Sequence, residues 1–144
     1  MTAETNRLVA DIQFARSEAM KRGTAVIICP SATPVAATPV CTAGEWASGW
    51  LVFASGDANA TFTAGTDTLL KAAEVTASEI LIGANTAGND DLHFRADAST
   101  NEAGTTVTLT LCDNRGVNYG KKIEIPPMGR PRLAAAVGTC PTAS

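Results

Sequence analysis

Only one stretch of this chain repeats its apolar residues with a helical period, and it lies at the start. The repeated residues are Leu8, Ile12, Ala15 and Ala19. Their steps of three and four residues place them on one face of a helix. Glu4 lies in the first turn and Arg22 in the last, as the helix dipole favours. Gly23 follows at once and is a natural helix end, so we predict a helix over residues 2–22.

After this helix the chain changes to short runs that alternate or contain β-branched residues, separated by Gly, Pro and Asp turns. Alternation of leucine and valine with threonine, as in 105–112, predicts strands with one buried and one wet face. The expected strands are 24–29, 49–53, 69–75, 79–83, 92–95, 105–112, 123–125 and, as an edge strand, 133–137. We therefore predict an α+β fold, in which an N-terminal amphipathic helix packs on antiparallel β-sheets as a sandwich. Residues 1–144 are expected to form a single domain, with a β-rich head over 24–144.

The four cysteines point to disulfides and away from zinc. They show no C-x-x-C spacing, and His93 is the single histidine. Two disulfides imply an oxidising compartment outside the cytosol, whereas four buried free thiols are the alternative. Four cysteines allow three pairings. We favour Cys29–Cys41 and Cys112–Cys140, because each pair brackets a Pro-, Gly- or Ala-rich excursion from a strand.

The net charge of −3 hides an asymmetry between the two parts of the chain. Residues 1–113 hold six Lys and Arg against thirteen Asp and Glu, whereas residues 114–144 hold five against one. The C-terminal part, residues 114–144, is therefore basic, whereas the rest of the chain is acidic. As a whole the chain does not have the charge of a nucleic-acid-binding protein, so any such binding must be local.

The sequence Gly-Arg-Pro-Arg at 129–132 is the most distinctive part of this basic end. Prolines at 126, 127 and 131 hold the segment extended, and side chains two residues apart then leave on the same side. Two guanidinium groups held in this way suit successive phosphates of a nucleic-acid backbone. The residues that we expect at a DNA site are Gly129, Arg130, Arg132, Lys121 and Lys122. The alternative is that the arginines solubilise an edge strand or pair with Glu124.

No set of residues predicts catalysis or a cofactor. A hydrolase needs a nucleophile, a base and an orienting group, and His93 is expected to be an exposed residue on a short strand. Asp57, Asn59 and the pair Asp90-Asp91 are read as turn residues, because no calcium-loop motif follows them. We expect no enzymatic activity, no cofactor and no bound metal.

Several motifs, taken in order, resemble the FimT/GspH family of minor pilins and pseudopilins, and FimT most closely. They are the block ARSEAMKRG at 15–23, Cys29-Pro30, GWLVF at 49–53 and the motif at 129–132. Membership implies a type III signal and a hydrophobic helix upstream of Met1, with helix 2–22 as the second half of that helix. The subunit would then sit in the inner membrane of a Gram-negative bacterium with a periplasmic head, before assembly into a pilus with other pilins.

The resemblance also implies a function. In the FimT branch a GRxR motif is associated with DNA binding during natural transformation, and Gly129, Arg130 and Arg132 match it. One alternative is a GspH-like pseudopilin with a structural role in type II secretion. The other is a secreted carbohydrate-binding sandwich in which Trp46 and Trp50 form a sugar platform.

Overall fold

The computed structural model describes residues 2–42, 45–55, 62, 67–75, 80–84, 92–97, 99–100, 106–115, 120–134 and 140. Across these residues one helix precedes eight strands. The elements are α1 (Thr2–Arg22), β1 (Val26–Pro30), β2 (Gly49–Ala54), β3 (Thr68–Glu74), β4 (Leu81–Ala84), β5 (Leu92–Phe94), β6 (Val107–Cys112), β7 (Lys121–Ile125) and β8 (Arg132–Ala134). The predicted helix therefore has the expected bounds. Gly23, at a φ of 65°, ends it and donates its backbone N–H to the Ala19 carbonyl (3.0 Å).

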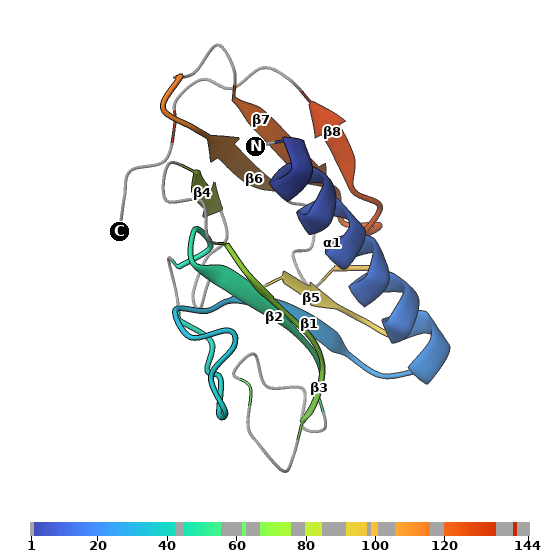
Figure 1. The fold of residues 1–144 in the computed structure, drawn as a ribbon. Coiled ribbons are helices and arrows are strands. Elements are labelled where there is room, and N and C mark those ends of the chain that lie inside the picture. Colours follow the sequence, from blue (N-terminus) through green and yellow to red (C-terminus); the bar gives the residue numbers. More distant parts are fainter. Residues whose placement is uncertain are drawn as a thin grey trace.

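The strands form two antiparallel sheets of four strands each, in the orders β3-β2-β1-β5 and β4-β6-β7-β8. Figure 1 shows α1 lying against both sheets, with β1, β2 and β5 to one side of it and β6, β7 and β8 to the other. This arrangement confirms the predicted α+β fold of a helix on antiparallel sheets.

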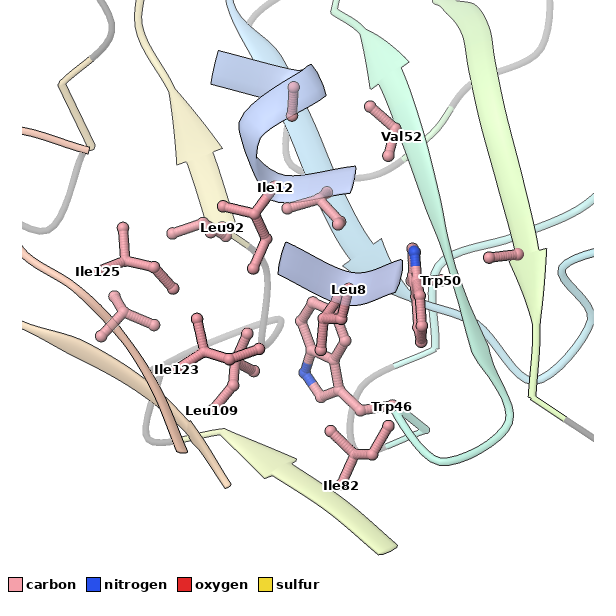
Figure 2. Packing of buried hydrophobic residues seen from close by; sticks show 14 of the residues in the cluster. Leu8, Ile12, Trp46, Trp50, Val52, Ile82, Leu92, Leu109, Ile123 and Ile125 are labelled. Atoms are coloured by element: carbon pink, nitrogen blue, oxygen red, sulfur yellow. The ribbon is translucent and has the colours of Figure 1, made fainter. Parts of the chain in front are cut away.

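The hydrophobic core lies where the apolar stripe of α1 meets the inner faces of both sheets. All four residues of the stripe, from Leu8 to Ala19, are fully buried. Figure 2 shows Leu8 and Ile12 between Trp46 and Trp50 on one side and Ile123 on the other. Complete burial of each large side chain stabilises the fold by about 1.5–3 kcal/mol. Helix and sheets therefore depend on one shared core.

Strands β1 and β2 are buried on both faces, which explains why GWLVF reads as a continuous apolar run. One face belongs to the main core, while a second cluster on the other face contains Ile27, Cys29, Leu51 and Phe53. The disulfide between Cys29 and Cys41 (Cα–Cα 5.7 Å) ties the loop after β1 over this second cluster.

Some sequence predictions differ from the structure or fall outside it. Strand β4 begins at Leu81 instead of residue 79, and β8 begins at Arg132, one residue earlier than expected. The predicted turn at 56–59, the acidic pair at 90–91, residues 76–79 and the end of the edge strand at 135–137 lie outside the described residues.

Candidate functional site

The basic motif begins in a tight turn that connects β7 to β8. The backbone N–H of Gly129 donates to the Pro126 carbonyl at 2.8 Å, which closes a four-residue turn. Pro127 occupies the second position, where its fixed φ suits such a turn, and Gly129 has a φ of 91° that other residues rarely adopt. The Pro127 carbonyl accepts the backbone N–H of the buried Thr100 at 2.9 Å. The turn is therefore fixed both by its own sequence and by an anchor outside it.

Beyond this turn the arginines alternate with a buried proline. Arg130 and Arg132 are exposed and Pro131 between them is buried. Burial thus alternates along this segment, as it does along an extended chain. Leu133, the next residue, is exposed on the short strand β8.

Arg132 has a carboxylate partner within the sheet. It lies opposite Glu124 on β7, and its Nε donates to Glu124 Oε1 at 3.3 Å. The arginine side chain is 66% exposed and that of the glutamate 25%. A surface pair of this kind contributes only about 0–1 kcal/mol, so a phosphate can displace the carboxylate at small cost.

The two lysines of β7 lie on different faces of the sheet. Lys122 pairs in register with Thr110 and Ala134 and shares its face with Glu124, away from the core. Lys121 has the parity of the buried Ile123 and lies half-buried at the strand end. The structure therefore places Lys122 on the same face as Arg132 and separates Lys121 from both.

Arg130 borders a pocket that the sequence did not reveal. The pocket has a volume of about 490 Å³ and lies between α1 and the segment after the turn. Its lining residues are Gln13, Arg16, Ser17, Met20, Arg130 and Pro131. The four helical members recur at helical spacing beside the apolar stripe. The same spacing is visible in the sequence and indicates that these four residues share one face of the helix.

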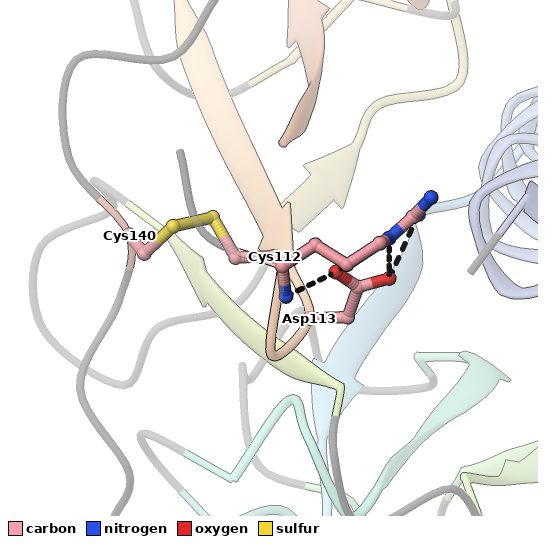
Figure 3. A network of polar contacts seen from close by, with 4 residues as sticks. Cys112, Asp113 and Cys140 are labelled. Atoms are coloured by element: carbon pink, nitrogen blue, oxygen red, sulfur yellow. Dashed lines mark hydrogen bonds and ion pairs between the residues drawn. A yellow bond between two sulfur atoms is a disulfide. The ribbon is translucent and has the colours of Figure 1, made fainter. Parts of the chain in front are cut away.

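Arg115, which contributes to the basic charge of the C-terminal part, forms an ion pair with Asp113, which Figure 3 labels. Its Nε lies 3.1 and 3.0 Å from the two carboxylate oxygens of Asp113, and its backbone N–H donates to the same side chain. These hydrogen bonds, first from the guanidinium and then from the backbone, lower the pKa of Asp113.

The adjacent disulfide joins Cys112 to Cys140 (Cα–Cα 5.7 Å), so both favoured pairings are present.

His93 and the two tryptophans differ in their surroundings. His93 is half-buried, not exposed as predicted, because it lies opposite Ile27 of the second cluster. Burial, followed by the charge of Arg95, lowers the pKa of its imidazole. Trp46 and Trp50 are 1% and 0% exposed, which is incompatible with an exposed sugar platform.

Two other kinds of feature are absent from the described residues. They contain no group of three or more His, Cys, Asp or Glu side chains placed to hold a metal ion. In the part of the chain that the structure describes, no helix is both long and apolar enough to cross a membrane.

Comparisons with known proteins agree with the fold. The profile of the GspH family, described as type II transport protein GspH, matches residues 4–129. A crystal structure of the Pseudomonas aeruginosa type IV minor pilin FimU, in space group P21, superposes with a TM-score of 0.71 at 21% identity, covering 97% of this chain and 94% of FimU. A second crystal form, P65, gives a TM-score of 0.70 at 20% identity, with 97% and 99% covered. No curated protein matches the chain significantly.

Proposed function

Because this chain belongs to the GspH family, we propose that it is a minor type IV pilin that binds DNA through its C-terminal basic segment. In this role it contributes to DNA uptake during natural transformation and to pilus assembly. Its function is that of a filament subunit, and it catalyses no reaction.

The observation that carries this proposal is the rigid presentation of Arg130 and Arg132. The turn closed by Gly129 and anchored on Thr100 holds the segment, and Pro131 is buried between the two exposed arginines. Side chains held in place before binding lose less conformational entropy when they engage a ligand. The arrangement also matches the GRxR pattern by which the sequence resembles FimT.

The expected binding mode is electrostatic and independent of base sequence. Guanidinium groups form paired hydrogen bonds with phosphate oxygens, and Lys122 adds a point charge on the same face as Arg132. Contacts to about three or four phosphates give a salt slope of roughly −3 and an affinity for one subunit that is micromolar or weaker. Several copies or partner pilins along a filament would raise the overall affinity by avidity.

The same proposal includes a place for the subunit in the cell. The periplasmic head would be held in the inner membrane by a hydrophobic helix that continues α1 upstream, and would then enter the pilus with other pilins. The fully buried stripe of α1, from Leu8 to Ala19, supports this, because it fixes the head rigidly to the helix that would join the filament.

The test is a fluorescence-anisotropy titration of labelled duplex DNA at two salt concentrations. The intact domain is compared with Arg130→Gln/Arg132→Gln and with the matched control Lys21→Gln/Arg22→Gln. The control removes the same charge from the C-terminal end of α1, where both residues pair with Glu18 and neither lines the pocket that Arg130 borders. We expect salt-sensitive binding that the first variant loses and the control retains, with circular dichroism unchanged in both. Absence of binding by the intact domain at low salt would refute the proposal.

A second candidate is a GspH-like pseudopilin of a type II secretion system. The description of the matching family and the ion pair of Arg132 with Glu124 favour it, since that pair gives the arginine a purely structural role. It predicts that the intact domain does not bind DNA. It also predicts that the arginine variants impair assembly of the secretion filament only as far as they destabilise the fold.

A further inference from the structure

One flank of α1 forms a second stripe beside its buried apolar stripe, with three polar residues and Met20. Gln13, Arg16, Ser17 and Met20 recur at steps of three, one and three residues and line the pocket against which Arg130 is placed. The stripe thus faces the Gly-Arg-Pro-Arg segment across the pocket. Arg16 and Arg130, from distant parts of the chain, therefore border the same pocket.

Arg16 differs from the other described basic residues of α1, because each of those has a carboxylate partner. The pairs are Arg7–Glu4 at 2.6 Å, Lys21–Glu18 at 3.9 Å and Arg22–Glu18 at 3.5 Å. Asp11, the remaining acid of the helix, pairs with Lys71 on the opposite flank. Within the described residues Arg16 has no ion pair, and its Nε is buried without a hydrogen-bond partner.

The pocket therefore brings together cationic donors without an anion. Its described lining contains two guanidinium groups, a hydroxyl and an amide, and no carboxylate. A buried donor without an acceptor costs free energy, and two like charges across one hollow repel each other. A bound oxyanion would remove both penalties, because its oxygens accept from the guanidinium groups while its charge neutralises them.

A phosphate within a nucleic-acid strand fits these donors better than an isolated carboxylate from a protein side chain. Arg132 stands two residues after Arg130 on the same segment and is exposed. A ligand with phosphates in series can therefore engage the pocket and Arg132 together, whereas a single carboxylate engages only one of them. The helix face and the turn then form one continuous binding surface.

We propose that the pocket between α1 and the β7–β8 turn is a subsite for one DNA backbone phosphate, held by Arg16 and Arg130 together. This inference rests on the proposed function and extends it to a residue of the helix. Ser17 and Gln13 supply further donors at the pocket wall. Arg132 and Lys122 contact the phosphates that follow along the strand, on the outer face of the sheet.

The experiment measures DNA affinity and its salt slope for Arg16→Gln, Arg130→Gln and the double variant. The control is Arg22→Gln, which removes the same charge from the same helix outside the pocket. Each pocket variant is expected to weaken binding about tenfold at low salt and to make the salt slope less negative by about 1. Because both arginines hold one phosphate, the double variant should also change the slope by about 1, and its loss of affinity should be smaller than the product of the two single losses.

Two further measurements keep the inference testable if Arg16→Gln folds poorly. Gln13→Glu places a carboxylate in the pocket from an exposed position and should weaken DNA binding without loss of stability. The Arg16 Nε–H signal in a nitrogen-15 NMR spectrum should shift on addition of duplex DNA or inorganic pyrophosphate.

The outcomes separate this inference from the proposed function. Wild-type affinity in Arg16→Gln with weakened binding in Arg130→Gln would overturn the subsite and leave DNA binding intact. No DNA binding by the intact domain would overturn both. A shift of the Arg16 signal by a Glu-rich peptide, and not by DNA or pyrophosphate, would overturn the phosphate subsite in favour of a protein partner.

Discussion

Replacing Glu124 by Gln should strengthen DNA binding, and this gain is a sharp test of the proposed surface. Glu124 holds Arg132 in a pair at 3.3 Å and stands on the face that would meet DNA. The substitution frees the guanidinium and removes a negative charge that repels phosphates. General damage to the fold cannot produce such a gain, because damage weakens binding.

The size of the gain follows from the exposure of the pair. With the arginine 66% exposed, the interaction that DNA must displace is worth about 0.2–1 kcal/mol. At 1.4 kcal/mol per factor of ten, this corresponds to about 1.4- to 5-fold tighter binding. The Debye length is about 10 Å at 0.1 M salt, so the gain should shrink as the salt concentration rises.

The assay is fluorescence anisotropy with labelled duplex DNA at low and moderate salt. Glu74→Gln is the matched control, because Glu74 is exposed on β3 of the other sheet and the net charge changes equally. In an Arg132→Gln background most of the gain from Glu124→Gln should disappear. The reasoning is refuted if Glu124→Gln leaves the affinity unchanged while Arg132→Gln weakens it, or if Glu74→Gln gives the same gain.

Two predictions concern the fold that carries the site. Asp11 is fully buried and accepts the Trp50 Nε1–H at 2.7 Å while pairing with Lys71, so Asp11→Ala should lower the free energy of unfolding by about 2–4 kcal/mol. Asp11→Asn keeps an acceptor and should cost less, and equal costs in urea unfolding followed by tryptophan fluorescence would contradict this account. The pKa of His93 is lowered in the fold by burial and Arg95, so the unfolded chain takes up the proton first as the pH falls. Stability should therefore drop as the pH falls below about 6.5, and this part of the drop should be absent in His93→Gln. Parallel pH profiles of the two proteins would contradict that assignment.

Local patterns were sufficient for the elements themselves. The helix over residues 2–22 could be predicted because its apolar period and the terminating Gly23 are both encoded within a few turns of chain. The same holds for β6, where alternation of Leu109 and its neighbours with threonine matches the observed burial. The disulfide pairing was favoured correctly because each cysteine pair closes a loop whose composition suits an excursion.

Predictions that depended on a neighbouring strand were less secure. His93 was expected to be exposed because Leu92 and Phe94 claim the opposite face. In the structure, His93 lies on the same face of the sheet as Ile27 and the second cluster, and the loop after β1 covers that face. Alternation identifies the two faces of a strand, but it does not say whether a second layer covers the outer one.

The candidate site shows the same division. The sequence by itself indicated that prolines stiffen the segment around Gly-Arg-Pro-Arg, but residues 126–129 form a tight turn where an extended stretch was predicted. Only the tertiary structure decided that Arg132 stands opposite Glu124 and that Arg130 shares a pocket with Arg16. The physical reason is that periodicity fixes the direction of a side chain relative to its own element. Strand register and the packing of α1 against the sheets decide which distant side chain it meets.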